Sequence, residues 1–118
     1  MPGYNFSMIP KTVPKVKTKY REISTQIPTP GTKEIFDRLN NVESRSMHGQ
    51  LPIVWNKAED FSVHDIANNK WIDFTSTIFV ANVGHSNPCV TAAIKDTLDQ
   101  PLYSCYAYAN PSRALYLE

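Results

Sequence analysis

The chain has 118 residues, of which 42% are hydrophobic and 19% are charged, and its formal net charge is +1. This composition is typical of one small globular domain and excludes an intrinsically disordered chain. The near-neutral charge gives the whole chain no basic footprint for nucleic acid, and no apolar run reaches the roughly 18 residues that a membrane-spanning helix needs.

Two cysteines, Cys89 and Cys105, are too few for a disulfide framework and lack metal-ligand spacing. Reduced thiols in a cytoplasmic protein are therefore expected. Residues 1–9 lack the basic segment and long apolar run of a secretory signal, which agrees with that location. The sequence thus favours a cytoplasmic protein without a membrane or nucleic-acid partner.

The first 29 residues are predicted to form an extended, basic, proline-rich arm. Four lysines and Arg21 lie between residues 11 and 21, and five of the nine prolines lie in the first thirty residues. Proline removes a backbone donor and fixes φ, so neither a regular helix nor a central strand is expected here. Three roles are open for the arm: its lysines keep the protein soluble, it lies across a partner subunit, or it binds RNA. RNA binding is the least favoured, because the aromatic residues of the arm are scattered and not interleaved with the charges.

A helix and three strands are predicted next. Thr32 is a candidate cap for a helix whose apolar face is Ile35, Phe36, Leu39 and Val42. Residues 51–55 and 70–74 are predicted as strands, and the alternation around Phe61 and Val63 predicts another between them. The Asn68-Asn69 pair indicates a turn, because asparagine tolerates positive φ. The three strands predict an antiparallel meander with one face on a core, and the fold class is α+β.

The rest of the chain alternates loop and helix. Residues 75–81 are apolar and β-branched, which fits either a strand or a buried loop. Gly84 marks a place where the backbone turns or approaches another group closely. Asn87-Pro88 predicts a capped helix start, with apolar positions continuing to Leu98. Asn110-Pro111 repeats the start signal.

No catalytic or metal-binding set is evident from the residues. His85 is the best single candidate for a functional residue, and the alternative is a histidine that shapes its loop. Cys89 stands in a helix's first turn, where a thiolate is stabilised, or it is a small buried residue. The three tyrosines at 103, 106 and 108 line a pocket or pack a domain edge.

From about Pro52 to Leu117 the chain resembles the N-terminal part of the class III pyridoxal-phosphate aminotransferases. The resemblance rests on Asp65, the Asn68-Asn69 turn, the strand end Trp71-Ile72-Asp73-Phe74 and the loop Asn82-Val83-Gly84-His85-Ser86-Asn87-Pro88, here called the Gly-His loop. The family usually has glycine where this chain has Asn68, and often near Thr77.

The resemblance implies a fold-type I enzyme. Residues 30–118 would supply the small-domain meander, the Gly-His loop and the start of the connection to the large domain. It maps the family's substrate-pocket residue to Ile78, where the alternative is an ordinary core isoleucine. The Schiff-base lysine and phosphate-binding loop of the family belong to the large domain, so this segment alone is expected to be inactive and to bind no cofactor.

The implied activity of the whole protein uses pyridoxal phosphate to move an amino group from an amino acid or amine to a keto acid or aldehyde, in a homodimer. Aminomutases, racemases and decarboxylases share the scaffold, so the resemblance does not choose among these reactions. Two other hypotheses stay open, a non-catalytic small α/β interaction module and a truncated inactive paralogue.

Overall fold

The computed structural model describes residues 6–99, 108–111 and 114 of the chain. They belong to two compact units that divide between His85 and Ser86, and each unit is described by itself. The first unit contains the sheet, and the second contains the helix after the Gly-His loop. Within the described ranges, no helix has the length and apolar character needed to cross a membrane.

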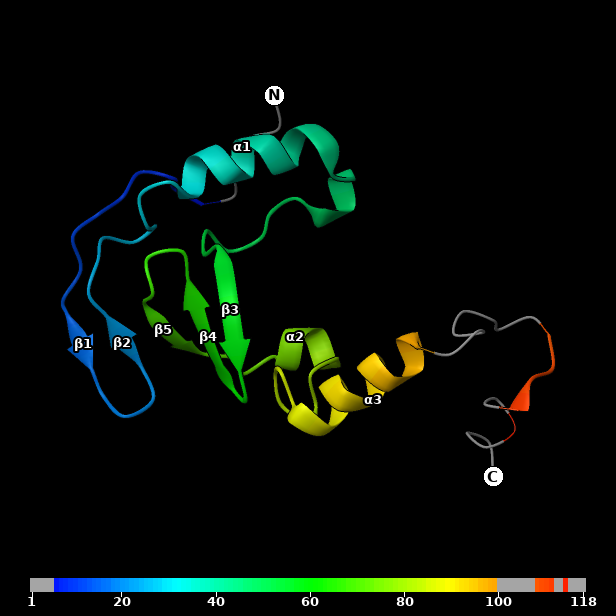
Figure 1. The fold of residues 1–118 in the computed structure, drawn as a ribbon. Helices are drawn as coiled ribbons and strands as arrows, with labels where there is room; N and C mark the ends of the chain where they lie inside the picture. The colour runs from blue at the N-terminus through cyan, green and yellow to red at the C-terminus, as the bar shows by residue number, and fades with distance from the viewer. Residues whose placement is uncertain (1–5, 100–107, 112–113, 115–118) are drawn as a thin grey trace. The chain divides into compact units, whose positions relative to one another are not determined.

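The first unit is built around a five-stranded sheet whose neighbouring strands are all antiparallel. The strand order is β1-β2-β5-β4-β3, which places the two N-terminal strands beside the C-terminal strand of the meander (Figure 1). The strands are β1 (Val16–Lys17), β2 (Glu22–Ile23), β3 (Trp55–Glu59), β4 (Ser62–Asp65) and β5 (Lys70–Ile72). The segment is α+β as predicted, but its sheet has five strands instead of three.

Strands β3, β4 and β5 form the predicted meander. Val63 is fully buried in β4 and pairs with Trp71 of β5. Asn68 turns the chain between these strands with a φ of 62°, the conformation that the sequence predicted for it. The first strand was predicted over residues 51–55, but β3 begins only at Trp55. It is an edge strand with mostly exposed residues, so it shows no apolar alternation.

The predicted arm is extended, but part of it belongs to the sheet. Thr18 donates from its amide and its hydroxyl to the carbonyl of Arg21, which closes a hairpin between β1 and β2. Glu22 then pairs with Lys70 of β5. The expectation that the arm contains no inner strand is wrong, because β2 lies between β1 and β5. The arm's prolines lie outside both two-residue strands and leave the pairing intact.

A buried polar cluster fastens the arm to the meander. Asn69 is fully buried, and its Oδ1 accepts from the amides of Ser24 at 2.8 Å and Thr25 at 3.3 Å. Its Nδ2 donates to Thr25 Oγ1 at 2.6 Å and to Asp65 Oδ2 at 2.8 Å. The hydroxyl of Thr29 donates to the same Asp65 oxygen at 3.1 Å. We call Thr25, Thr29, Asp65 and Asn69 the arm clasp.

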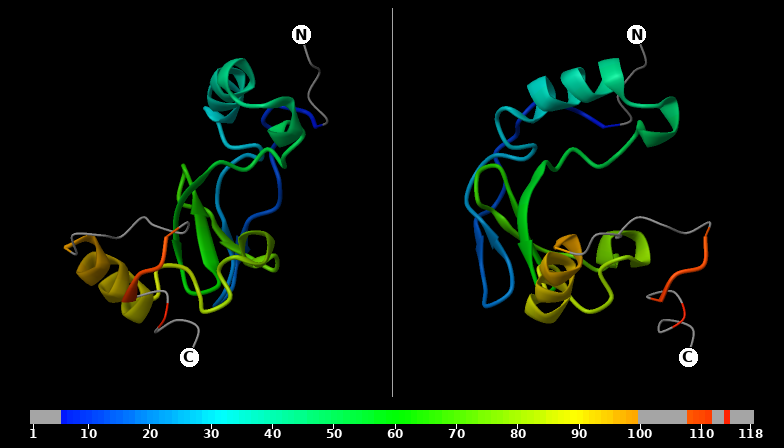
Figure 2. Two further views of the ribbon diagram at one scale, coloured as in Figure 1. Left: turned by 90° about the vertical axis from the view of Figure 1, so that its right-hand side faces the viewer. Right: turned by 45° about the vertical axis from the view of Figure 1, so that its right-hand side comes forward.

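The helix predicted after Pro30-Gly31 is α1 (Thr32–Val42), and a 3₁₀ turn over Arg45–Met47 follows it. Within the first unit, α1 lies beyond the end of the sheet at which β3 begins; Figure 2 shows the same arrangement from two further directions. Gly31, with a φ of 91°, occupies the cap position, so Thr32 is the first helical residue and not the predicted cap.

The helix of the second unit, α3 (Pro88–Leu98), has the predicted bounds. The side chain of Asn87 accepts from the amides of Cys89 and Val90, as expected of a cap before a proline. Near the end of the chain, the amide of Ala114 donates to the carbonyl of Asn110 at 3.3 Å. Most of the second helix predicted from Pro111 lies outside the described residues.

Few large apolar side chains among the described residues of the first unit are enclosed. Those that are buried are Met8, Ile23, Phe36 and Val63. The segment after β5, in contrast, is rich in exposed apolar side chains, namely Phe74, Ile78, Phe79, Val80 and Val83. Such a concentration of exposed apolar residues is typical of a surface that contacts something else.

Candidate functional site

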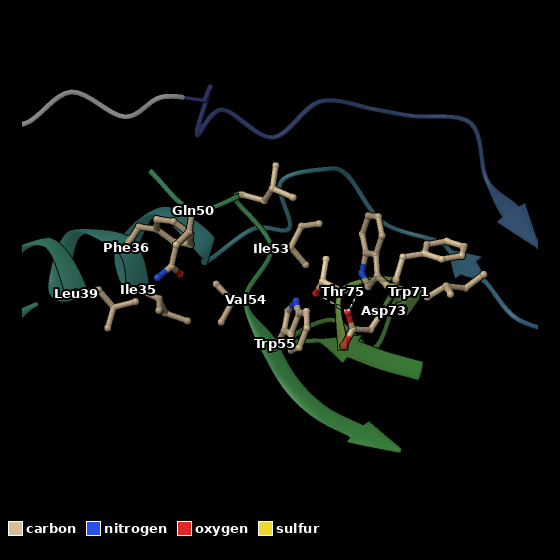
Figure 3. A pocket seen from close by; sticks show the side chains of 13 residues that line it. Ile35, Phe36, Leu39, Gln50, Ile53, Val54, Trp55, Trp71, Asp73 and Thr75 are labelled. Carbon is tan, nitrogen blue, oxygen red and sulfur yellow. Dashed lines mark hydrogen bonds between the residues drawn. The ribbon is translucent and has the colours of Figure 1, made fainter. Parts of the chain in front are cut away.

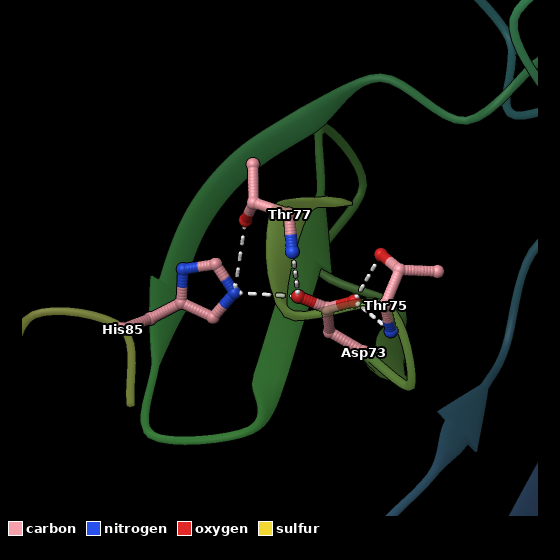
Figure 4. A network of polar contacts seen from close by, with 4 residues as sticks. All are labelled: Asp73, Thr75, Thr77 and His85. Atoms are coloured by element: carbon pink, nitrogen blue, oxygen red, sulfur yellow. Dashed lines mark hydrogen bonds and ion pairs between the residues drawn. The ribbon is translucent and has the colours of Figure 1, made fainter. Parts of the chain in front are cut away.

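A nearly buried carboxylate stands directly after β5. The side chain of Asp73 is 2% exposed. Its Oδ1 accepts from the amide of Thr75 at 2.8 Å and from the Thr75 hydroxyl at 2.7 Å, and its Oδ2 accepts from the amide of Thr77 at 3.0 Å. His85 Nε2 lies 2.8 Å from the same Oδ2 (Figure 4). Because an ionised carboxylate only accepts hydrogen bonds, His85 donates here from Nε2.

These contacts change the acidity of Asp73. Burial raises the pKa of the carboxyl group, because it removes water from the charged form. Hydrogen bonds from His85, Thr75 and Thr77 act in the opposite direction and prevail, so the pKa of Asp73 falls from 3.8 to about 2. The carboxylate is therefore charged across the neutral range and remains an acceptor for the groups around it.

The residues that follow Asp73 form a short left-handed turn, α2 (Ser76–Phe79). The φ angles of Ser76, Thr77, Ile78 and Phe79 are 48°, 52°, 56° and 67°. Thr77 and Ile78 have ψ angles of 51° and 55°, which completes left-handed helical geometry. Such geometry costs roughly 1–2 kcal/mol per L-residue and is a genuine outlier for β-branched side chains. The sequence fitted a strand or a buried loop over residues 75–81, and the structure contains neither.

Ile78 occupies the middle of this turn. Its side chain is 79% exposed, so the described residues do not enclose it as they enclose a core isoleucine. The neighbouring Phe79 is exposed to the same extent. Two apolar side chains of the turn are therefore exposed. Its backbone is held by hydrogen bonds from the amides of Thr75 and Thr77 to Asp73.

Gly84 brings the Gly-His loop against the turn between β3 and β4. It has a φ of 89°, and a Cβ at this position would lie 3.0 Å from Asp60 Oδ1 and 3.2 Å from Asp60 Cα. The next residue, His85, exchanges backbone hydrogen bonds of 2.9 and 2.7 Å with Asp60. This close approach places the His85 ring in contact with Asp73 and in a T-shaped contact with Trp55, whose ring centre is 5.9 Å away.

A largely apolar hollow of about 730 Å³ lies beside this network in the first unit (Figure 3). Its wall comes from α1, from the segment that leads into β3 and from the end of β5, and it includes Phe36, Trp55 and Trp71. Phe74 and Thr75 also line it, whereas Ile78 does not. The hollow and the exposed turn are therefore neighbouring but separate features.

The other residues singled out from the sequence are less informative. Cys89 is exposed, so the interpretation as a small buried residue is wrong. Tyr108 is 78% exposed, and the other two tyrosines of its group lie outside the described residues. No group of three or more His, Cys, Asp or Glu side chains in the described ranges has a geometry that could hold a metal ion.

Sequence reasoning missed the role of Asp73 as the centre of the network. A signal was present in Asp73-Phe74-Thr75, because an aspartate commonly accepts from the amide two residues on in an Asx-turn. The partner His85 had been singled out, but its contact with Asp73 depends on the return of the chain past Asp60. That return is a long-range pairing, and no local pattern reports it.

Comparison with known proteins identifies a family for most of this region. A family model described as aminotransferase class-III matches residues 43–117. This range contains the meander, the Asp73 network, the left-handed turn and the Gly-His loop. It also agrees with the resemblance found from about Pro52 to Leu117.

Individual relatives are similar over the same part of the chain. A 4-aminobutyrate aminotransferase of Mycobacterium leprae is 30% identical over 73% of this chain, which covers 19% of that protein. An ornithine aminotransferase of Brevibacillus brevis is 31% identical over 74% of this chain, which covers 22% of that protein. A leucine/methionine racemase of Thermococcus litoralis is 34% identical over 64% of this chain and 17% of its own length. The chain thus spans about a fifth of the length of these relatives.

Proposed function

Because the chain belongs to the class III aminotransferase family, we propose that it is part of an enzyme that moves an amino group from an amino acid or amine to a keto acid or aldehyde. The observation that carries this proposal is the family match over residues 43–117. Relatives that act on 4-aminobutyrate and ornithine support amino-group transfer at the level of the family. The similarity to a racemase supports racemisation as the second candidate reaction.

Pyridoxal phosphate is the cofactor that this family implies. A Schiff-base lysine needs a setting that removes water from its amine, but all eight lysines of the chain are exposed or half-buried. These residues do not fit the cofactor by themselves. We therefore propose that the lysine and the phosphate-binding loop belong to a large domain outside this segment, and we assign no step of the reaction to these residues.

Ile78 is proposed as an apolar wall beside the substrate chain. Its 79% exposed side chain, on an anchored turn, supports this role, because a pocket residue must be held firmly and yet be free to contact a ligand. Gly84 and His85 are proposed as the structural residues of the adjacent loop. Asp73 extends this set, since it links His85 to the turn that carries Ile78.

The exposed apolar surface of the segment suits contact with the large domain and with a second subunit of a homodimer. Phe74, Phe79 and Val80 are 89%, 79% and 80% exposed, which is unfavourable in water and favours burial against another chain or domain. A fold-type I arrangement in the cytoplasm is the corresponding proposal for the whole protein.

An absorbance spectrum of the intact gene product tests this function. We expect the imine band of bound pyridoxal phosphate, and we expect an amino donor to change it. The 118-residue segment, purified alone, serves as the control and is expected to show neither band nor borohydride-trapped cofactor. An intact product without the band would favour the inactive paralogue or the interaction module.

A further inference from the structure

The hydrogen bonds within the left-handed turn do not determine its handedness. Its backbone hydrogen bonds run from the amide of Phe79 to the carbonyl of Thr75 at 2.9 Å and from the amides of Val80 and Ala81 to the carbonyl of Ser76, both at 2.8 Å. A right-handed turn makes the same kind of bond and suits Thr77 and Ile78 better, so these bonds do not choose the handedness.

Packing of the turn's own side chains does not choose it either. Ile78 and Phe79 are each 79% exposed, and Thr77 is also exposed. Side chains in this state contribute little energy that could select a strained backbone. The selection must come from a group that contacts the backbone of the turn from outside it.

Asp73 is that group. Its Oδ1 fixes the first amide of the segment, at Thr75, and its Oδ2 fixes the amide of Thr77, so the carboxylate spans the point where φ becomes positive (Figure 4). His85 holds Oδ2 at 2.8 Å, and Thr77 Oγ1 lies 3.5 Å from the same His85 Nε2. His85 is in turn fixed by its paired backbone bonds with Asp60.

We propose that Asp73 and His85 are positioning residues whose contact holds residues 76–79 in the left-handed turn and thereby sets where Ile78 stands in the substrate pocket. The consequence for substrate choice rests on the proposed function of Ile78. The conformation of the turn does not, because it is measured without any activity. Asparagine at position 73 keeps one acceptor oxygen and places a donor nitrogen where the other was. It therefore cannot accept hydrogen bonds on both sides, from Thr75 on one and from Thr77 and His85 on the other.

The test is an NMR measurement on the full chain. A residue with positive φ gives a strong intraresidue NOE between its amide and Hα protons. A residue of the right-handed helix α1 gives a weak intraresidue NOE and serves as the reference. In the unaltered chain, Ile78 should give the strong NOE. Asp73→Asn should reduce it to the α1 level. The matched control Asp60→Asn should retain it, because Asp60 holds His85 through backbone atoms and its own φ of 51° suits asparagine.

A second variant tests the contact between His85 and Asp73. His85→Ala removes the donor to Oδ2 and leaves the carboxylate of Asp73 in place, so it should also reduce the strong NOE at Ile78. Cross-strand NOEs between Val63 and Trp71 report whether the sheet is folded. If Asp73→Asn unfolds the sheet, His85→Ala decides: a folded sheet with a weak NOE at Ile78 supports the proposal, and any other result overturns it.

Two further results would also overturn the inference. One is a weak NOE at Ile78 in the unaltered chain, and the other is a strong NOE that persists in Asp73→Asn. A turn that responds as expected, together with an intact gene product that binds no pyridoxal phosphate, would uphold the positioning role and reject the proposed function, so the two failures are distinguishable.

Discussion

Removing the amide of Asn69 should release the arm from the sheet. Asn69→Ala deletes a side chain that is fully buried and that bonds to the arm at Ser24 and Thr25 and to the carboxyl group of Asp65. Alanine replaces none of these partners. The amides of Ser24 and Thr25 then lose their acceptor in a half-buried region. Asp65 Oδ2 loses one donor and keeps Thr29 and Trp71.

The expected loss is large for a segment of this size. A hydrogen bond to a carboxylate contributes about 1.5–3 kcal/mol, and a half-buried donor that loses its acceptor costs about 1 kcal/mol, the lower end of the range for buried donors. We therefore expect Asn69→Ala to lower the free energy of unfolding by about 3–4 kcal/mol, a sizeable part of the roughly 5–15 kcal/mol that stabilises a typical domain. The control Asn56→Ala, at an exposed position of β3, should change it by at most about 0.5 kcal/mol.

Urea unfolding followed by tryptophan fluorescence measures the loss, since the indole of Trp71 donates to Asp65 within the same cluster. Limited trypsin digestion measures release of the arm, whose lysines between residues 11 and 19 are exposed. Asn69→Ala should be cut there faster than Asn56→Ala. A loss below about 1 kcal/mol together with unchanged cleavage would refute the clasp.

Three further predictions concern the turn and the Gly-His loop. Ile78→Trp should raise the KM for long or branched substrates in the active enzyme with Tm nearly unchanged; a loss of about 1–3 kcal/mol with unaltered substrate preference would mean that Ile78 is a core residue. Gly84→Ala should destabilise by at least about 1–2 kcal/mol, because a Cβ would lie 3.2 Å from Asp60 Cα and φ is 89°; a neutral result in chemical denaturation would contradict the close approach. Asp73 has a lowered pKa, so its contribution is complete above its unfolded pKa of 3.8 and is lost as the pH falls towards about 2. That contribution is about 1–2 kcal/mol after allowance for solvent screening, and the difference in unfolding free energy between the unaltered chain and Asp73→Asn should shrink over that pH range. A difference that does not change with pH would mean that the charge of Asp73 does not stabilise the fold.

Elements with local signals were predictable from the sequence. Asn87 and Pro88 specify the start of α3 through one side chain and one fixed φ, and Asn68 specifies its turn in the same way. The order of β3, β4 and β5 also followed, because short turns join consecutive antiparallel strands. Even there, the bounds of β3 were displaced, since an exposed edge strand carries no apolar period.

Features that depend on distant pairing were not predictable. β1 and β2 have two residues each, too few to show a period, and β2 is recognisable through its pairing with β1 and with Lys70 of β5. For the left-handed turn the local signal predicts the wrong conformation, because Thr77 and Ile78 are β-branched and disfavour positive φ. Tertiary contacts through Asp73 and His85 override that preference, which is a pattern expected near functional sites.

The central claim is that this chain is part of a pyridoxal-phosphate aminotransferase, and the spectrum of the intact gene product tests it most directly. We predict an imine absorbance band that an amino donor converts and a keto acid or aldehyde restores. A correctly folded intact product that binds no pyridoxal phosphate, and shows no such cycle with any amino donor, would contradict it.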